Sequence, residues 1–81
     1  MTEAEYRAVF IAELVNVAPD LDPATIAGTD HIQDDLELDS MDVLNLVAAL
    51  HKRLDLSIPE VDYPRIETPD KAAAYLAQQL G

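Results

Sequence analysis

The chemistry most evident in this chain is that of one serine hydroxyl among carboxylates, in the run Asp34-Asp35-Leu36-Glu37-Leu38-Asp39-Ser40-Met41-Asp42. Asp39 stands where the N-cap of a helix is expected. Asp42, three residues later, adds negative charge to the first turn, where the helix dipole favours it. An Asp-Ser pair at a helix start is most often capping chemistry alone. The apolar pattern that follows is what singles out Ser40.

Two apolar stripes run along the segment from Ser40 to about Leu54. The first has the spacing of a helix packed on a core, and it consists of Val43, Leu46, Val47, Leu50 and Leu54. The second lies roughly 130° away on the helical wheel, and it consists of Met41, Leu44 and Ala48. If the first stripe faces the core, the second lies largely in water beside Ser40. An exposed apolar strip next to a modifiable hydroxyl is typical of a docking surface.

A first helix is predicted from Glu3 to about Asn16. Thr2 and Glu5 fit a capping box at its start, and Pro19 ends it. Its expected core face is Tyr6, Val9, Phe10, Leu14 and Val17. The residues expected in solvent are Glu3, Arg7 and Glu13.

A long connection, Asp20–Leu38, follows this helix. Leu21-Asp22-Pro23 predicts a short turn that runs through Ala27 and stops at Gly28. The residues of the connection that are expected to pack against the core are Ile26, Ile32 and Leu36. Counted from Asp30, the pattern of a calcium-binding EF-hand loop fails at three positions. No dedicated metal site is therefore expected, although weak divalent cation binding stays open.

Two further elements follow the helix that begins at Ser40. A single turn is predicted over Glu60–Tyr63, limited by Pro64. Thr68 and Pro69 predict the N-cap and first position of a last helix, which runs to about Leu80. Its expected core face is Ala73, Leu76, Ala77 and Leu80. The fold class is therefore all-α, a small four-helix bundle. It has three main helices, a short third helix, and a long structured loop between the first two, within one domain covering residues 1–81.

The composition is strongly acidic. The 81 residues include 16 acidic and five basic ones, for a net charge of −11, and no Lys or Arg lies between Arg7 and Lys52. Such a surface disfavours nucleic acid and anionic membranes and attracts basic protein partners. The absence of cysteine excludes disulfides, thiolate metal sites and an intrinsic thiol. The acidic N-terminus is unlike a signal peptide, and no apolar run reaches membrane-spanning length. A cytoplasmic monomer is expected.

Several of these motifs, in this order, resemble the acyl carrier protein family over nearly the whole chain. The segment Asp35-Leu36 followed by Leu38-Asp39-Ser40-Met41-Asp42 resembles the family's Asp-Ser-Leu attachment motif. Ile58-Pro59 is similar to the start of its third helix. Ile66-Glu67-Thr68 with Ala72-Ala73-Ala74-Tyr75-Leu76 resembles the entry to its fourth helix.

The resemblance implies that Ser40 carries 4′-phosphopantetheine. A separate phosphopantetheinyl transferase would attach it from coenzyme A, with magnesium stabilising the phosphate charge. The thiol of the arm would hold acyl groups as thioesters and present them to acyl-transferring or acyl-modifying enzymes with basic docking patches. The chain itself would be a non-catalytic carrier. Asp39 would cap the helix and aid recognition by the transferase. The residues expected to face partners are Met41, Asp42, Leu44 and Ala48.

The sequence also departs from the family pattern. Glu37 stands where the family often has glycine, and Met41 stands where it often has leucine. The positions commonly acidic in fatty-acid carriers are here Asn45, His51, Lys52 and Arg53. These differences favour a specialised lipid or polyketide pathway over housekeeping fatty acid synthesis.

Three other functions remain to be weighed. A peptidyl or aminoacyl carrier shares the fold, and an unmodified acidic helical adaptor would share the charge. A hydrolase would need a histidine base for Ser40. His51 lies about 16 Å along the same helix and cannot serve. His31, in the loop, is more often a solvated side chain than a base.

Overall fold

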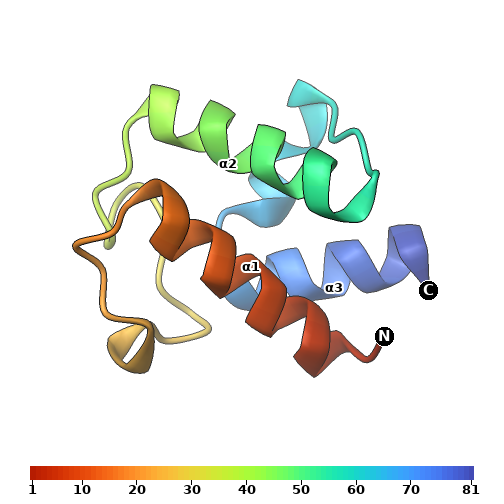
Figure 1. Ribbon diagram of the computed structural model, residues 1–81, viewed down its shortest axis with the longest axis horizontal. Coiled ribbons are helices and arrows are strands. Elements are labelled where there is room, and N and C mark those ends of the chain that lie inside the picture. The colour runs from red at the N-terminus through yellow and green to blue at the C-terminus, as the bar shows by residue number, and fades with distance from the viewer.

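The computed structural model describes residues 1–81 and contains only helices (Figure 1). The three α-helices are α1 (Glu3–Val17), α2 (Ser40–Leu54) and α3 (Pro69–Leu80). Two 3₁₀-helices lie in the connections, η1 (Pro23–Thr25) and η2 (Glu60–Ile66). The predicted all-α bundle of three main helices with a short helix before the last is confirmed. None of the helices combines the length and the apolar character needed to cross a bilayer.

The helix starts are fixed by the caps that the sequence predicts. At α1, the Glu5 N–H donates to the Thr2 hydroxyl at 3.2 Å, and the Thr2 N–H donates to the Glu5 carboxylate at 2.8 Å. At α3, the Lys71 N–H donates to the Thr68 hydroxyl at 3.1 Å, with Pro69 at the first helical position. Each cap supplies an acceptor to an N–H group that the helix cannot satisfy itself.

The three α-helices and η2 are held around one hydrophobic core, whereas η1 buries none of its residues. Helix α1 packs against both α2 and α3, and η2 packs against α3. Figure 1 shows α2 along the top and α3 below it, with α1 crossing in front of the start of α3 and the long loop at the end away from both termini. The large hydrophobic side chains with no exposed surface are Phe10, Leu14, Leu46, Leu50, Ile66 and Leu76. Because α1, α2, η2 and α3 each contribute to this set, the position of α2 depends on all the others.

Glu13 of α1 corrects one prediction. Expected in solvent, it is only 8% exposed. Its carboxylate accepts hydrogen bonds from the Asn16 side chain and from Arg53 of α2, both at 3.0 Å. The hydrogen bond from Asn16, and then the Arg53 guanidinium, lower the pKa of Glu13. A buried carboxylate is tolerated because it is paired, and its partner Arg53 is 40 residues away in sequence.

The core face of α3 also differs from the prediction. Leu80, expected in the core, is 38% exposed, whereas Ala72 and Tyr75 are buried. The Tyr75 hydroxyl donates to the Asp62 carboxylate of η2 at 2.8 Å, which satisfies its polar end. Burial raises the pKa of Tyr75, and the bond to Asp62 raises it further.

The connections are close to prediction but not identical to it. η2 continues past Pro64 to the buried Ile66 instead of ending at Tyr63, because burial of Ile66 stabilises the extra turn. η1 ends at Thr25 rather than Ala27. In the long loop, Ile32 is buried and Leu36 packs against the core as predicted. Ile26 lies outside the core cluster, and the buried Leu38 joins it instead.

Candidate functional site

Ser40 is the first residue of α2, and the turn around it is held by hydrogen bonds that do not involve its hydroxyl. The Asp42 N–H donates to the Asp39 carboxylate at 2.8 Å, and the Asp39 N–H donates to the Asp42 carboxylate at 3.3 Å. The predicted N-cap at Asp39 is therefore confirmed, and the structure adds the reciprocal bond of a capping box. The exposed Ser40 hydroxyl takes part in neither bond. It is free to react while the turn around it stays in place.

The start of α2 carries charges of both signs. The N–H groups of Ser40 and Met41 have no partner within the helix and lie at the positive end of its dipole. A phosphate ester on Ser40 would lie near these donors. The carboxylates of Asp39 and Asp42 make the surrounding surface negative, which favours an approaching protein with a basic surface.

The first apolar stripe of α2 faces the core and the second faces solvent, as the helical wheel predicts. Val43 is 8% exposed and Leu46 is fully buried, whereas Met41 is 63% and Leu44 50% exposed. Ala48 is exposed as well. An apolar strip in water next to Ser40 is thus present. Its use by partners stays a prediction.

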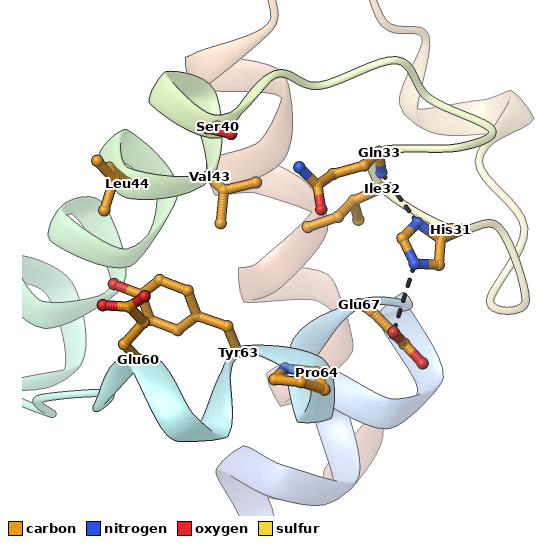
Figure 2. A pocket seen from close by; sticks show the side chains of 10 residues that line it. All are labelled: His31, Ile32, Gln33, Ser40, Val43, Leu44, Glu60, Tyr63, Pro64 and Glu67. Atoms are coloured by element: carbon orange, nitrogen blue, oxygen red, sulfur yellow. Dashed lines mark hydrogen bonds and ion pairs between the residues drawn. The ribbon is translucent and has the colours of Figure 1, made fainter.

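A cavity of about 450 Å³ opens beside Ser40 (Figure 2). Ser40, Val43 and Leu44 form its α2 side, and Figure 2 shows η2 across from them. Its remaining lining residues are His31, Ile32, Gln33, Glu60, Tyr63, Pro64 and Glu67. The volume lies in the range of small-molecule pockets. A group attached to Ser40 could therefore enter this cavity directly.

His31 at one end of the cavity joins the loop to the start of α3. Its Nδ1 accepts from the N–H groups of Gln33 and Asp34 at 3.2 and 3.1 Å, and its Nε2 lies 3.4 Å from the Glu67 carboxylate. The side chain is 28% exposed, so it is not the solvated loop histidine expected. With Nδ1 already accepting two bonds, His31 is a structural link and no base for Ser40.

His51 offers no base for Ser40 either, because it lies about 16 Å further along α2, and its Nδ1 lies 3.3 Å from the Ser57 hydroxyl instead. Neither histidine can therefore serve as the base that a hydrolase with Ser40 as nucleophile requires.

Two carboxylates line the cavity on the side away from Ser40. The hydrogen bond from Lys71 lowers the pKa of Glu67, and the nearby charges of Lys71 and His31 lower it further, so Glu67 is anionic at neutral pH. Glu60 is exposed and makes no ion pair. Sequence reasoning missed Glu60, Tyr63 and Glu67 as site residues, because nothing local to them indicates that η2 folds back toward Ser40.

The basic end of α2 is less positive than its sequence indicates. The Arg53 guanidinium binds Glu13 at 3.0 Å, so its charge is largely offset. Lys52 is exposed and makes no ion pair. Lys52 is thus the main positive charge on this end of the helix.

Residues 10–76 match the family described as "Phosphopantetheine attachment site". The chain is 34% identical over 59 residues to an acyl carrier protein of Bdellovibrio bacteriovorus, covering 73% of this chain and 76% of that protein. It is 38% identical over 58 residues to a mitochondrial acyl carrier protein of Neurospora crassa, covering 72% of this chain and 43% of that protein. It is 42% identical over 52 residues to a non-reducing polyketide synthase of Preussia isomera, covering 64% of this chain and 2% of that protein. The matched region thus spans less than half the length of the mitochondrial acyl carrier protein and of the polyketide synthase.

The fold has a solved counterpart. The solution structure of a proposed acyl carrier protein from Anaplasma phagocytophilum aligns with a TM-score of 0.86 at 26% identity, covering 100% of this chain and 94% of that one. The two chains therefore share one fold.

Proposed function

The chain belongs to the acyl carrier protein family, whose members are non-catalytic carriers of phosphopantetheine, and on this premise we propose that Ser40 is the residue that carries the arm. One observation carries the proposal. Ser40 has an exposed hydroxyl on a turn that Asp39 and Asp42 hold in place, at the rim of a cavity. Ser57, the other serine, lies in the extended segment after α2, where its hydroxyl contacts His51.

The attachment chemistry is a phosphoryl transfer by a partner enzyme. The Ser40 oxygen attacks the phosphorus of coenzyme A next to the pantetheine unit. The new O–P bond forms as the pyrophosphate bond breaks, and the nucleotide part leaves with the electron pair. The serine proton passes to a base of the transferase, and Mg²⁺ offsets the phosphate charge. The bound arm supplies the thiol that this cysteine-free chain lacks.

Intact-mass measurement tests the assignment. The protein is incubated with coenzyme A, Mg²⁺ and a phosphopantetheinyl transferase, and the wild type should gain the mass of one phosphopantetheine group. Ser57→Ala, the matched control, should gain it too, whereas Ser40→Ala should not. A pantetheinylated Ser40→Ala protein, or an unmodified wild type, would contradict the proposal.

The partner surface is proposed from exposure and charge. The residues in this surface are Met41, Asp42, Leu44 and Ala48, beside Ser40 on α2. Partners are acyl-handling enzymes whose docking patches combine basic and apolar side chains. Because the three α-helices and η2 share one core, we propose that residues 1–81 act as one monomeric carrier domain. Its cytoplasmic location stays an expectation from the sequence.

We further propose that the carrier serves a specialised lipid or polyketide pathway. The support is the far end of α2, where His51 and Lys52 stand exposed in place of carboxylates. General fatty-acid synthesis enzymes should associate slowly with the wild type. Changing His51 and Lys52 together to Glu should speed association, most clearly at low salt.

Arg53 is left unchanged in this test, because a glutamate there would face the buried Glu13. The control adds carboxylates to α3 instead, by Ala74→Glu and Gln79→Glu. Fast association of the wild type, or equal effects of both variants, would contradict the specialised pathway.

A further inference from the structure

The two sides of the cavity beside Ser40 differ in chemistry. The α2 and loop side carries the apolar side chains of the cavity, with Ile32 and Val43 buried and Leu44 half in water, and its polar groups are those of Ser40, His31 and Gln33. The side formed by η2 and the residue after it carries Glu60, Tyr63 and Glu67 (Figure 2). A chain that enters the cavity therefore meets apolar surface on one side and two carboxylates on the other.

No free cation offsets these carboxylates. His31 is the only basic side chain in the lining, and its Nε2 is directed at Glu67. Lys71, outside the lining, is bound to the same Glu67 carboxylate. Glu60 makes no ion pair, and no Lys or Arg is found among the lining residues. A third carboxylate placed here would be desolvated beside like charges, which is unfavourable on both counts.

We propose that this cavity selects among acyl groups by charge. It accommodates acyl chains with a neutral end, including those with a hydroxyl, and rejects chains that end in a carboxylate. Glu60 is the main specificity-determining residue, since Glu67 is already paired. Tyr63 and Gln33 supply hydrogen-bonding groups for a neutral polar substituent. A carboxylated unit would stay outside and exposed to partner enzymes. The inference rests on attachment at Ser40.

The test compares three acyl groups of equal chain length. Hexanoyl, 3-hydroxyhexanoyl and hexanedioyl arms are loaded from their coenzyme A thioesters by the transferase, and intact mass verifies each product. Amide chemical shifts of Val43, Leu44 and Tyr63, relative to the unacylated holo form, then report entry into the cavity. The first two groups should shift these amides. The hexanedioyl group should occupy the cavity on the order of tenfold less at low salt.

Two variants assign the effect to its residue. Glu60→Gln should raise the hexanedioyl shifts toward the hexanoyl values, because it removes the unpaired charge and keeps the shape. Glu3→Gln removes one exposed carboxylate from α1, away from the cavity, and should leave the shifts unchanged.

Equal shifts for hexanoyl and hexanedioyl in the wild type would overturn the proposal. So would an absence of hexanoyl shifts, or equal effects of the two variants. Failure to load any group would instead contradict attachment at Ser40, so the two failures are distinguishable.

Discussion

Glu37 gives the most direct test of the backbone that leads into Ser40. Its φ of 62° lies in the left-handed region. There a side chain costs about 1–2 kcal/mol, because its Cβ crowds the following carbonyl oxygen. Glycine avoids this cost but stabilises the unfolded chain by about 0.4–1 kcal/mol of entropy. We therefore expect Glu37→Gly to raise the free energy of unfolding by about 0.5–1 kcal/mol.

The expected change is large enough to measure. For a chain of 81 residues, the entropy of unfolding is about 0.17 kcal/mol/K, so the melting temperature should rise by about 3–6 °C. Circular dichroism melts and urea titrations in one buffer give the shift and the free energy. The slope of free energy against urea should stay unchanged if only stability differs.

A second variant separates strain from charge. Glu37→Ala removes the carboxylate from an acidic loop but keeps the Cβ, so it should gain much less than Glu37→Gly. Asp55, at φ 54°, is the other left-handed non-glycine residue. Asp55→Gly should gain less than Glu37→Gly, because aspartate tolerates this conformation better. If Glu37→Ala matches Glu37→Gly, the strain argument is refuted and charge repulsion is the cause.

Three further outcomes follow from the packing and the charges. The pKa of Glu13 is lowered by Asn16 and then Arg53. The ionised Glu13 should thus contribute its full stabilisation of the folded state above the ordinary glutamate pKa of about 4.3, and this contribution should be lost as the pH falls through the lowered pKa. In urea titrations at a series of pH values, Glu13→Gln should therefore weaken the decrease in the free energy of unfolding at acidic pH. Leu44→Asp should change the free energy of unfolding by less than about 0.5 kcal/mol, whereas Val43→Asp on the buried face should cost several kcal/mol in the same melts. Added salt or millimolar divalent cation should raise the melting temperature by screening the loop carboxylates before α2, and an indifferent melting point would show that they do not interact.

Features encoded within four residues were predictable from the sequence. The caps at Thr2, Asp39 and Thr68 each need one side chain and an N–H group three residues on. The two stripes of α2 need only the helical period, and the wheel places Val43 inward and Leu44 outward as observed. Such patterns are readable because partner and period are local.

Features made by distant residues were not predictable in this way. The sequence around Glu13 predicts a solvent-exposed side chain, because its partner Arg53 lies 40 positions away in the chain and approaches it only in the folded structure. The cavity depends on η2 folding back toward α2, so Glu60 and Tyr63 carry no local signal of their place in it. His31 likewise gains its role only through Glu67. The resemblance predicts which serine carries the arm, whereas the surroundings of Ser40 are visible only in the structure.

The arrangement at Ser40 separates the reactive group from the groups that hold the helix. Asp39 and Asp42 cap α2 through each other, and Val43 and Leu46 anchor it in the core. Because the Ser40 hydroxyl shares in neither task, esterifying it breaks no bond that the fold requires. A large arm can therefore be added after folding, and the same turn then offers free N–H groups to the phosphate. A carrier needs this independence, since its fold must be the same whether the arm is absent, bare or loaded.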